Sequence, residues 1–485
     1  MMDTDVVVVL PGIMGSTLGV TTADREASEN LIWAPTAGAV WNNFTGAHRI
    51  QDYALPEGIG DEHPGDGVEP VDLMPDVHAI PGVWTPVKGY TVLVKHLERL
   101  GYHQTPTDGR PPNLVLVPYD WRLSNRYNGQ RLAGIVEPAL GRWRSQGGRF
   151  ADAQLVFVCH SMGGLVARWY IEMCGGAGHT RKLITLGTPW RGAAKAVAQL
   201  VNGVTPGIGP LHLSLTEFAT SLVSSYQLMP EYACLTDGPR DPKKTTEHSA
   251  LPLPTARVAD AMAFYAALQD AERARPASVE MAYAIVGTRQ PTWTTITLNP
   301  DGTATAHDEF GTDNDYGDAT VPLTGAIGHD QPLDTARIFR IRDQHGNLQR
   351  NQGVLDEIEE VITTVPVRRR ASHPVTIRAS APDLVLPGQP LTVSASIDGT
   401  DTRHAVRVQV IDEHGKVLQS RQPSLTHGHA EVTFPELPPG THTIILDSPS
   451  PMAGPSQPGP NYAGAIEPVT ATTLVWSETG GGGSA

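Results

Sequence analysis

A serine between small residues follows an apolar run at positions 156–164, which read V-F-V-C-H-S-M-G-G. Where a strand turns sharply into a helix, such a serine is presented as a nucleophile, usually within the pattern G-x-S-x-G. The residues two before and two after the serine lie close together at this turn, so both must be small. Gly163 meets this requirement, and Cys159 is small enough to replace the first glycine at some steric cost. The pattern predicts Ser161 as a nucleophile; the alternative is a serine that only caps a helix.

A glycine-rich loop follows the first apolar run of the chain, in V-L-P-G-I-M-G-S at residues 9–16. Backbone N–H groups of such a loop can point at the carbonyl oxygen of a reacting ester, where negative charge develops. We predict the N–H groups of Ile13 and of Met162, the residue after the serine, as the two oxyanion donors. A plain turn would contain the same glycines, so this alternative stays open.

A nucleophilic serine needs a base to take its proton and an acid to orient that base. In sites of this kind the two follow the serine in the order Asp, then His. Asp318 lies in the polar turn Y-G-D-A-T-V-P-L and His345 in R-D-Q-H-G-N, just after an apolar run, so we predict them as acid and base. The rival histidines are His160, which is adjacent to the serine, and His307 and His329 in loops. Asp318 could also be a turn aspartate that bonds only its own backbone.

Metal and cofactor sites are not expected. The acidic run D-N-D-Y-G-D at 313–318 has its glycine one place too early for a calcium-binding EF-hand loop, and no glutamate closes twelve residues. The three cysteines, Cys159, Cys174 and Cys234, are odd in number and lack the spacing of metal ligands.

Charge and the N-terminal residues bear on partners and location. The net charge of −15 argues against nucleic acid as a partner, because phosphate binding needs clustered Lys and Arg. This net charge does not exclude contact between a lid segment over the site and a membrane surface. The N-terminus has acidic residues where a signal peptide has basic ones, and the apolar run that follows is too short to span a bilayer. We therefore expect a cytoplasmic protein.

The elements that must position these residues follow from hydrophobic patterning. Short apolar runs, mostly rich in β-branched residues, predict buried parallel strands, and helical patterns at 92–100, 129–146 and 164–174 lie between them. This alternation predicts an α/β fold with a mostly parallel sheet. Two insertions, 22–88 and 200–265, are interpreted as lids, binding loops or surface decoration. The apolar runs are 6–10, 114–117, 155–159, 183–186, 282–286 and 338–341.

A change of composition near residue 365 predicts a second domain. Residues 1–364 are expected to form the α/β domain and 365–374, with its three arginines, a linker. Over 375–479, apolar and polar residues alternate in short runs that are separated by turn residues. This pattern predicts an antiparallel β-sandwich. Residues 480–485, G-G-G-G-S-A, have the composition of a flexible linker. The predicted sandwich could bind a protein partner.

Together these motifs resemble those of the lecithin:cholesterol acyltransferase family. The matching segments are, in order, V-L-P-G-I-M-G-S, V-P-Y-D-W-R-L-S, C-H-S-M-G-G, L-G-T-P-W-R-G-A, G-D-A-T-V-P-L and the segment around His345. The resemblance implies an α/β-hydrolase fold with a lid over a lipid-binding cleft, a triad of Ser161, Asp318 and His345, and the oxyanion donors proposed above. It also implies that the segment 120–122, Asp-Trp-Arg, supports the site structurally.

Family members cleave an acyl ester, often of a phospholipid, and pass the acyl group to an alcohol or to water. We therefore expect a serine acyl-ester hydrolase or acyltransferase that acts on a lipid-like ester through an acyl-serine. Two alternatives stay open: an esterase or lactonase for a non-lipid ester, and a non-catalytic binding scaffold. Cys159 and the added β-rich domain depart from the usual family pattern.

Overall fold

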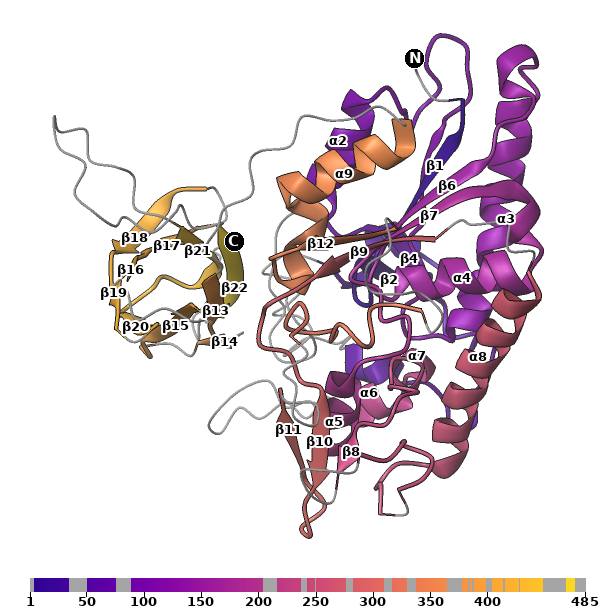
Figure 1. Cartoon of the computed structure of the whole chain (residues 1–485). Helices are drawn as coiled ribbons and strands as arrows, with labels where there is room; N and C mark the ends of the chain where they lie inside the picture. Colours follow the sequence, from indigo (N-terminus) through magenta and orange to yellow (C-terminus); the bar gives the residue numbers. More distant parts are fainter. Residues whose placement is uncertain are drawn as a thin grey trace, which may run out of the picture.

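The larger part of the chain is built on a parallel sheet (Figure 1). Its six strands lie in the order β12-β9-β7-β6-β1-β5, and every neighbouring pair is parallel. Their bounds are β1 (Val6–Leu10), β5 (Leu114–Leu116), β6 (Leu155–His160), β7 (Thr180–Leu186), β9 (Ala282–Gly287) and β12 (Ile338–Ile341). All the apolar runs that predicted strands lie in this sheet, which confirms the α/β fold. The computed structural model describes residues 4–34, 50–75, 89–203, 216–236, 242–248, 250–275, 282–308, 316–328, 337–363, 377–382, 384–385, 388–397, 404–412, 415–426, 428–447 and 468–475.

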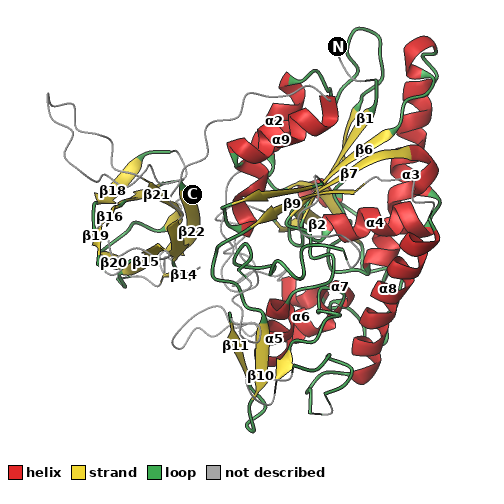
Figure 2. Cartoon of the chain, in the orientation of Figure 1, coloured by secondary structure: helices red, strands yellow, loops and turns green. Residues whose placement is uncertain are grey.

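Helices cover both faces of the sheet, which explains why the central strand β1 is apolar at every position. Side chains alternate along β1: Val6, Val8 and Leu10 pack into one core cluster, while Val7 and Val9 pack into another. The first cluster faces α3 (Asn125–Arg144), α4 (Gly163–Met173) and α8 (Thr255–Ala274). The second faces α2 (Thr91–Arg99) and α9 (Gln352–Thr363), which lie together on the other side (Figures 1 and 2).

The two predicted insertions have secondary structure of their own. The first contributes β3 (Leu31–Trp33) and β4 (Val68–Leu73), which pair with the preceding strand β2 (Ser16–Val20) in the order β3-β2-β4. The second contains α6 (Thr216–Ser221), α7 (Val223–Tyr226), β8 (Leu235–Thr236) and the start of α8. Strand β8 joins β10 (Thr295–Leu298) and β11 (Ala304–His307) in a small sheet beside α5 (Ala194–Asn202). Among the described helices, none is long and apolar enough to cross a membrane.

The C-terminal residues form two main sheets around a separate core. One sheet is β13 (Ile377–Ser380), β15 (Leu391–Ile397) and β20 (His429–Phe434). The other is β14 (Leu384–Val385), β22 (Val469–Val475), β21 (Gly440–Asp447), β17 (Arg407–Ile411) and β18 (Val417–Arg421). The pairs are antiparallel, as predicted, except that β14 runs parallel to β22. Strands β16 (His404–Ala405) and β19 (Ser424–Leu425) pair with each other in a separate two-stranded antiparallel sheet. The predicted linker 365–374 and tail 480–485 lie outside the described residues.

Candidate active site

Ser161 lies at the turn between β6 and α4, in a strained backbone conformation. Its φ of 51° falls in the left-handed region, which residues other than glycine rarely adopt. The Ser161 N–H donates to the carbonyl of Leu186 at 2.9 Å, and the hydroxyl of Thr188 donates to the Ser161 carbonyl at 2.8 Å. The end of the neighbouring strand β7 therefore holds the turn on both sides. A serine on such a strand-to-helix turn is the nucleophile elbow of α/β-hydrolases.

The residues that flank the elbow have no room to be large. A Cβ on Gly163 would lie 2.3 Å from the carbonyl oxygen of Pro11, which is closer than any real contact. Cys159 is fully buried in β6, where it pairs with Leu10 on one side and Thr185 on the other. Burial raises the pKa of the Cys159 thiol well above its usual value, so the thiol is a neutral packing group.

The structure brings Ser161, His345 and Asp318 into one hydrogen-bonded chain. Nε2 of His345 lies 2.9 Å from the Ser161 hydroxyl oxygen, and Nδ1 lies 2.7 Å from Oδ2 of Asp318. Because an ionised carboxylate only accepts, the proton of the neutral ring is on Nδ1, and Nε2 is free to take the serine proton. All three residues are buried, with exposed fractions of 6%, 3% and 1% respectively.

The carboxylate of Asp318 also forms the turn in which it lies. Its Oδ1 accepts the N–H groups of Thr320 at 3.0 Å and Val321 at 2.7 Å. A further bond runs from the His345 N–H to the Asp318 carbonyl at 2.7 Å. Asp318 therefore does both: its Oδ1 stabilises the turn, as the alternative of a turn aspartate requires, while its Oδ2 faces His345.

The histidine next to the serine has a different set of partners. Nδ1 of His160 lies 2.9 Å from the Tyr90 hydroxyl, and Nε2 lies 3.0 Å from the carbonyl oxygen of His345. Burial, together with the neighbouring His345 ring, lowers the pKa of His160 to about 3, so the ring is neutral. A carbonyl can only accept, so Nε2 donates to it and Nδ1 accepts from Tyr90. With both ring nitrogens occupied, His160 is not placed to act on Ser161.

The other rival histidines do not join this group. His307 lies on β11, where its Nε2 is 3.0 Å from the Thr297 hydroxyl. His329 lies outside the described residues, as do positions 313–315 of the acidic run. Within the described ranges, no group of three or more His, Cys, Asp or Glu side chains is placed to hold a metal ion.

The loop after β1 passes directly against the serine. A Cβ on Gly12 would lie 2.9 Å from Cβ of Ser161. The Gly12 N–H donates to the Tyr90 hydroxyl at 2.8 Å, and the Tyr119 hydroxyl donates to the Pro11 carbonyl at 2.9 Å. Two aromatic side chains from other segments thus fix the position of this loop.

The predicted oxyanion donors flank this approach. Met162 immediately precedes α4, where the first N–H groups of a helix have no partner within it. Across the described part of the chain, no backbone acceptor is found for the N–H of Ile13 or of Met162. The role of Ile13 and Met162 as oxyanion donors stays a prediction.

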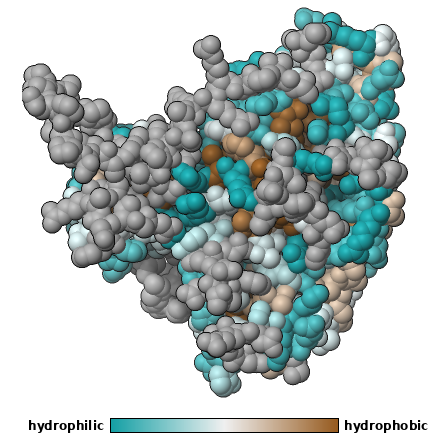
Figure 3. Space-filling model, viewed as in Figure 1, coloured by the Kyte–Doolittle hydropathy of each residue, from teal (hydrophilic) through white to brown (hydrophobic). Residues whose placement is uncertain are grey.

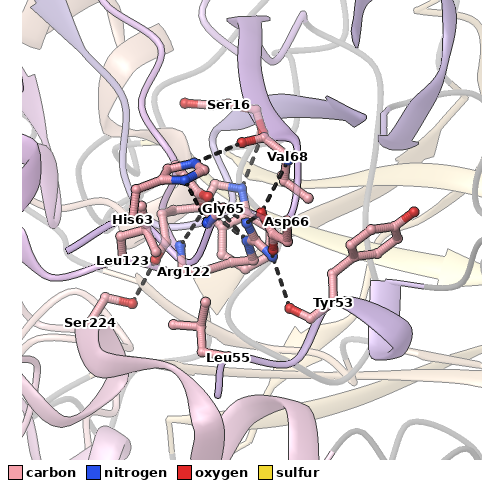
Figure 4. Close-up of polar contacts among 12 residues, drawn as sticks. Ser16, Tyr53, Leu55, His63, Gly65, Asp66, Val68, Arg122, Leu123 and Ser224 are labelled. Carbon is pink, nitrogen blue, oxygen red and sulfur yellow. Dashed lines mark hydrogen bonds and ion pairs between the residues drawn. The ribbon is translucent and has the colours of Figure 1, made fainter. Parts of the chain in front are cut away.

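Arg122 of the Asp-Trp-Arg segment lies in a network of polar contacts with Asp66 and Tyr53 (Figure 4). Arg122 is fully buried and forms ion pairs with Asp120 at 2.7 Å and with Asp66 at 2.8 Å. Burial alone would lower the pKa of Arg122, but these two carboxylates raise it, so the guanidinium is charged. The indole N–H of Trp121 donates to the Ser16 carbonyl at 3.2 Å. Sequence reasoning missed Asp66, because it lies in the first insertion and no local pattern links it to Arg122.

Comparisons with known proteins agree with the resemblance drawn from the motifs. Residues 71–250 match the family model described as lecithin:cholesterol acyltransferase. A human lysosomal phospholipase A and acyltransferase is 32% identical over 120 residues, which are 24% of this chain and 27% of the human protein. The rat relative of the same name is 31% identical over the same length and shares. The chain thus spans about a quarter of the length of these relatives.

Two solved structures are similar at low identity. A Bacillus licheniformis lipase in propeptide form is 10% identical with a TM-score of 0.37, and the match covers 97% of this chain and 93% of the lipase. A CARDB domain of a Pyrococcus furiosus protein, in complex with di-metal ions, is 15% identical with a TM-score of 0.15, over 21% of this chain and 89% of that domain. The family match includes Ser161 and the Asp-Trp-Arg segment and ends before Asp318. Residues 71–250 are thus similar to the lecithin:cholesterol acyltransferase family.

Proposed function

We propose that this chain is a serine acyl-ester hydrolase or acyltransferase that acts on a lipid-like ester such as a phospholipid. The observation that best supports it is the chain of hydrogen bonds from Asp318 through His345 to Ser161, at 2.7 and 2.9 Å. The family match and the names of the relatives favour a lipid ester as the acyl donor.

In the first half of the proposed reaction, Nε2 of His345 takes the hydroxyl proton of Ser161 while the oxygen attacks the ester carbonyl carbon. The N–H groups of Ile13 and Met162 stabilise the resulting oxyanion. Asp318 holds the ring in the required tautomer and stabilises its positive charge. The carbon–oxygen bond to the leaving alcohol then breaks, this alcohol takes the proton from Nε2, and an acyl-serine is left.

In the second half, an acceptor gives its proton to Nε2 of His345 and attacks the acyl-serine. Water as the acceptor releases a free acid, and an alcohol gives a new ester. The proton then returns to Ser161. The two outcomes share one intermediate, so the same residues serve hydrolysis and acyl transfer.

Apolar residues at the surface of the protein support the proposal that the substrate is apolar. Brown, apolar residues reach the surface in patches near the middle of the face in Figure 3. In the first insertion, Leu31 is also 41% exposed. We propose that the insertions contact a lipid surface, and co-sedimentation with phospholipid vesicles tests this. The cytoplasmic location stays a prediction.

Covalent labelling of the full chain tests the assignment. A fluorophosphonate should form an adduct at Ser161, and Ser161→Ala should lower esterase kcat on the order of 10⁴-fold or more. Ser145→Ala, which changes an exposed serine on the far end of α3, is the matched control and should keep full activity. The absence of an adduct would favour a binding scaffold.

Product analysis identifies the substrate and the acceptor. Mass spectrometry of mixed phospholipids, incubated with and without a long-chain alcohol, should show free fatty acid in both cases or a new ester when alcohol is present. Cleavage of short acyl esters without cleavage of phospholipids would favour an esterase or lactonase for non-lipid esters.

A further inference from the structure

The first strand of the C-terminal sandwich lies against the loops that contain the candidate acid and base. Nε2 of Gln344, the residue directly before His345, donates to the carbonyl of Ala379 in β13 at 2.9 Å. The Ala379 N–H lies 3.5 Å from Oε1 of Gln290, at the outer limit of a hydrogen bond. Both backbone polar groups of one residue in the sandwich therefore face glutamines of the α/β region.

Strand β13 is the edge of its sheet, since the order is β13-β15-β20. An edge strand has a row of backbone groups without a neighbouring strand, and proteins usually cover or block such an edge. Here Gln344 and Gln290 cover it at Ala379. The edge strand of the sandwich and the glutamines of the α/β region thus supply each other's hydrogen-bond partners.

Gln290 connects this contact to the acid. It is fully buried, and its N–H donates to the Gly317 carbonyl at 2.9 Å, next to Asp318. The hydroxyl of Thr292 accepts the N–H groups of Gly317 and Ala319, at 3.0 and 2.9 Å. Gln290 and Thr292 therefore form one hydrogen-bonded turn with the residues on either side of Asp318.

A second contact reaches the acid loop from the same strand. The guanidinium carbon of Arg378 lies 3.7 Å from the centre of the Tyr316 ring, a cation–π arrangement. Tyr316 precedes Asp318 by two residues. Strand β13 thus contacts the loop of the base through Gln344 and the loop of the acid through Gln290 and Tyr316.

The contact between β13 and these loops borders an open space. Beside it opens a cavity of about 610 Å³ between Pro291 and the outer faces of β13, β15 and β20, where Ser394 and Glu431 lie. Among the described residues, contacts of Arg378 and Ala379 hold β13 against the loops of the acid and the base beside this cavity. Single substitutions there should have effects that can be measured.

We propose that the sandwich positions the catalytic acid and base. Ser161 is held by the central sheet, but Asp318 lies on a loop and His345 at the start of the short 3-10 helix His345–Arg350, so the geometry of the hydrogen-bonded chain depends on where these segments are fixed. A misplacement of about 1 Å is enough to slow a reaction by orders of magnitude. Gln344 and Gln290 are positioning residues, since they act through the loops. The inference rests on the proposed function, because it assigns the sandwich a part in that same reaction.

Substitutions in the full chain test the proposal. Gln344→Ala and Arg378→Ala should each lower kcat for a short acyl ester about fivefold to twentyfold, with an unchanged KM and an unchanged Tm. Arg378→Lys keeps a cation over the Tyr316 ring and should recover most of the lost activity. The double variant should lose less than the product of the two single effects, because both act through one docking contact.

Matched controls exist in both regions. Gln352→Ala removes an exposed glutamine of α9 that bonds Asp356, and Arg421→Ala removes a cation–π contact with Phe434 inside the sandwich. Both should keep the wild-type kcat. Wild-type kcat in Gln344→Ala and Arg378→Ala would overturn the proposal, as would losses that only follow a lower Tm. Labelling of wild-type Ser161 by the fluorophosphonate separates this failure from a failure of the proposed function.

Discussion

At the scale of single residues, Cys159 tests the geometry of the elbow. Cys159→Gly should keep esterase kcat within about threefold, because it only frees space, at a cost of about 1 kcal/mol in strand stability. Cys159→Leu adds volume at a fully buried position between Leu10 and Thr185 and should destabilise by about 1–3 kcal/mol. It should also lower kcat more than about tenfold as the turn shifts. Equal activity in both variants would show that small size is not required there.

Tyr90 links the candidate oxyanion loop to His160. Its buried hydroxyl accepts the Gly12 N–H and donates to Nδ1 of His160. Tyr90→Phe leaves both groups unpaired, and each loss costs about 1 kcal/mol or more. Since Gly12 precedes Ile13, we expect kcat to fall about tenfold with little change in KM.

Steady-state kinetics on a short acyl ester checks the Tyr90 prediction. Tyr127→Phe is the matched control, because no hydrogen bond of the Tyr127 hydroxyl is found among the described residues; it should behave as the wild type. Full kcat in Tyr90→Phe would mean that the loop keeps its position without this hydroxyl.

The lowered pKa of His160 predicts a pH dependence of stability. In the folded protein this pKa is about 3, against about 6.5 in an unfolded chain. The unfolded state therefore binds a proton below about pH 6.5 that the folded state does not, so stability is complete above that pH and falls as the pH drops toward 3. At pH 5 the loss is about 2 kcal/mol. Urea unfolding at pH 7 and 5 should show a smaller loss in His160→Gln, and identical losses would contradict the assignment.

At the scale of elements, a buried ion pair joins the helix after the nucleophile to α8. Arg168 of α4 is 2% exposed, pairs with Glu272 at 2.7 Å, and donates to the Trp190 carbonyl at 3.0 Å. Glu272→Gln should destabilise by about 2 kcal/mol, because it leaves a buried guanidinium without its charge partner. Arg273→Ala, which breaks an exposed pair with Asp270 on the same helix, should cost less than about 0.5 kcal/mol. Urea unfolding compares the two, and equal midpoints would contradict the prediction.

The elements differ in how far they could be predicted. Buried parallel strands are continuous β-branched runs, so each strand of the central sheet was visible, and so were the loops with Asp318 and His345. Helix α8 was missed although Val258, Ala261, Phe264 and Leu268 follow a helical spacing on its buried face. The Gly-Pro turns before it favoured reading the whole stretch as an irregular insertion.

Contacts between distant segments could not be predicted at all. The pairing of Asp66 with Arg122 and the contact of Gln344 with Ala379 join residues whose neighbours in the sequence contain no matching pattern. Period-two alternation predicted that β13 is a strand, but not that it is an edge or what covers it. Such contacts follow only from how the completed elements pack.

At the scale of the whole molecule, the two cores predict separate unfolding steps. The buried residues of the sandwich pack with one another, and none is shared with the clusters on either face of the central sheet. Because the buried cores are separate, unfolding of the two regions need not be cooperative. Calorimetry should therefore resolve two transitions, the smaller one from the sandwich, since a small core buries less of its surface. A fluorophosphonate adduct at Ser161 should raise the temperature of the larger transition more than that of the smaller. A single transition with equal calorimetric and van't Hoff enthalpies would mean that the contact of β13 with the α/β region couples both cores into one folding unit.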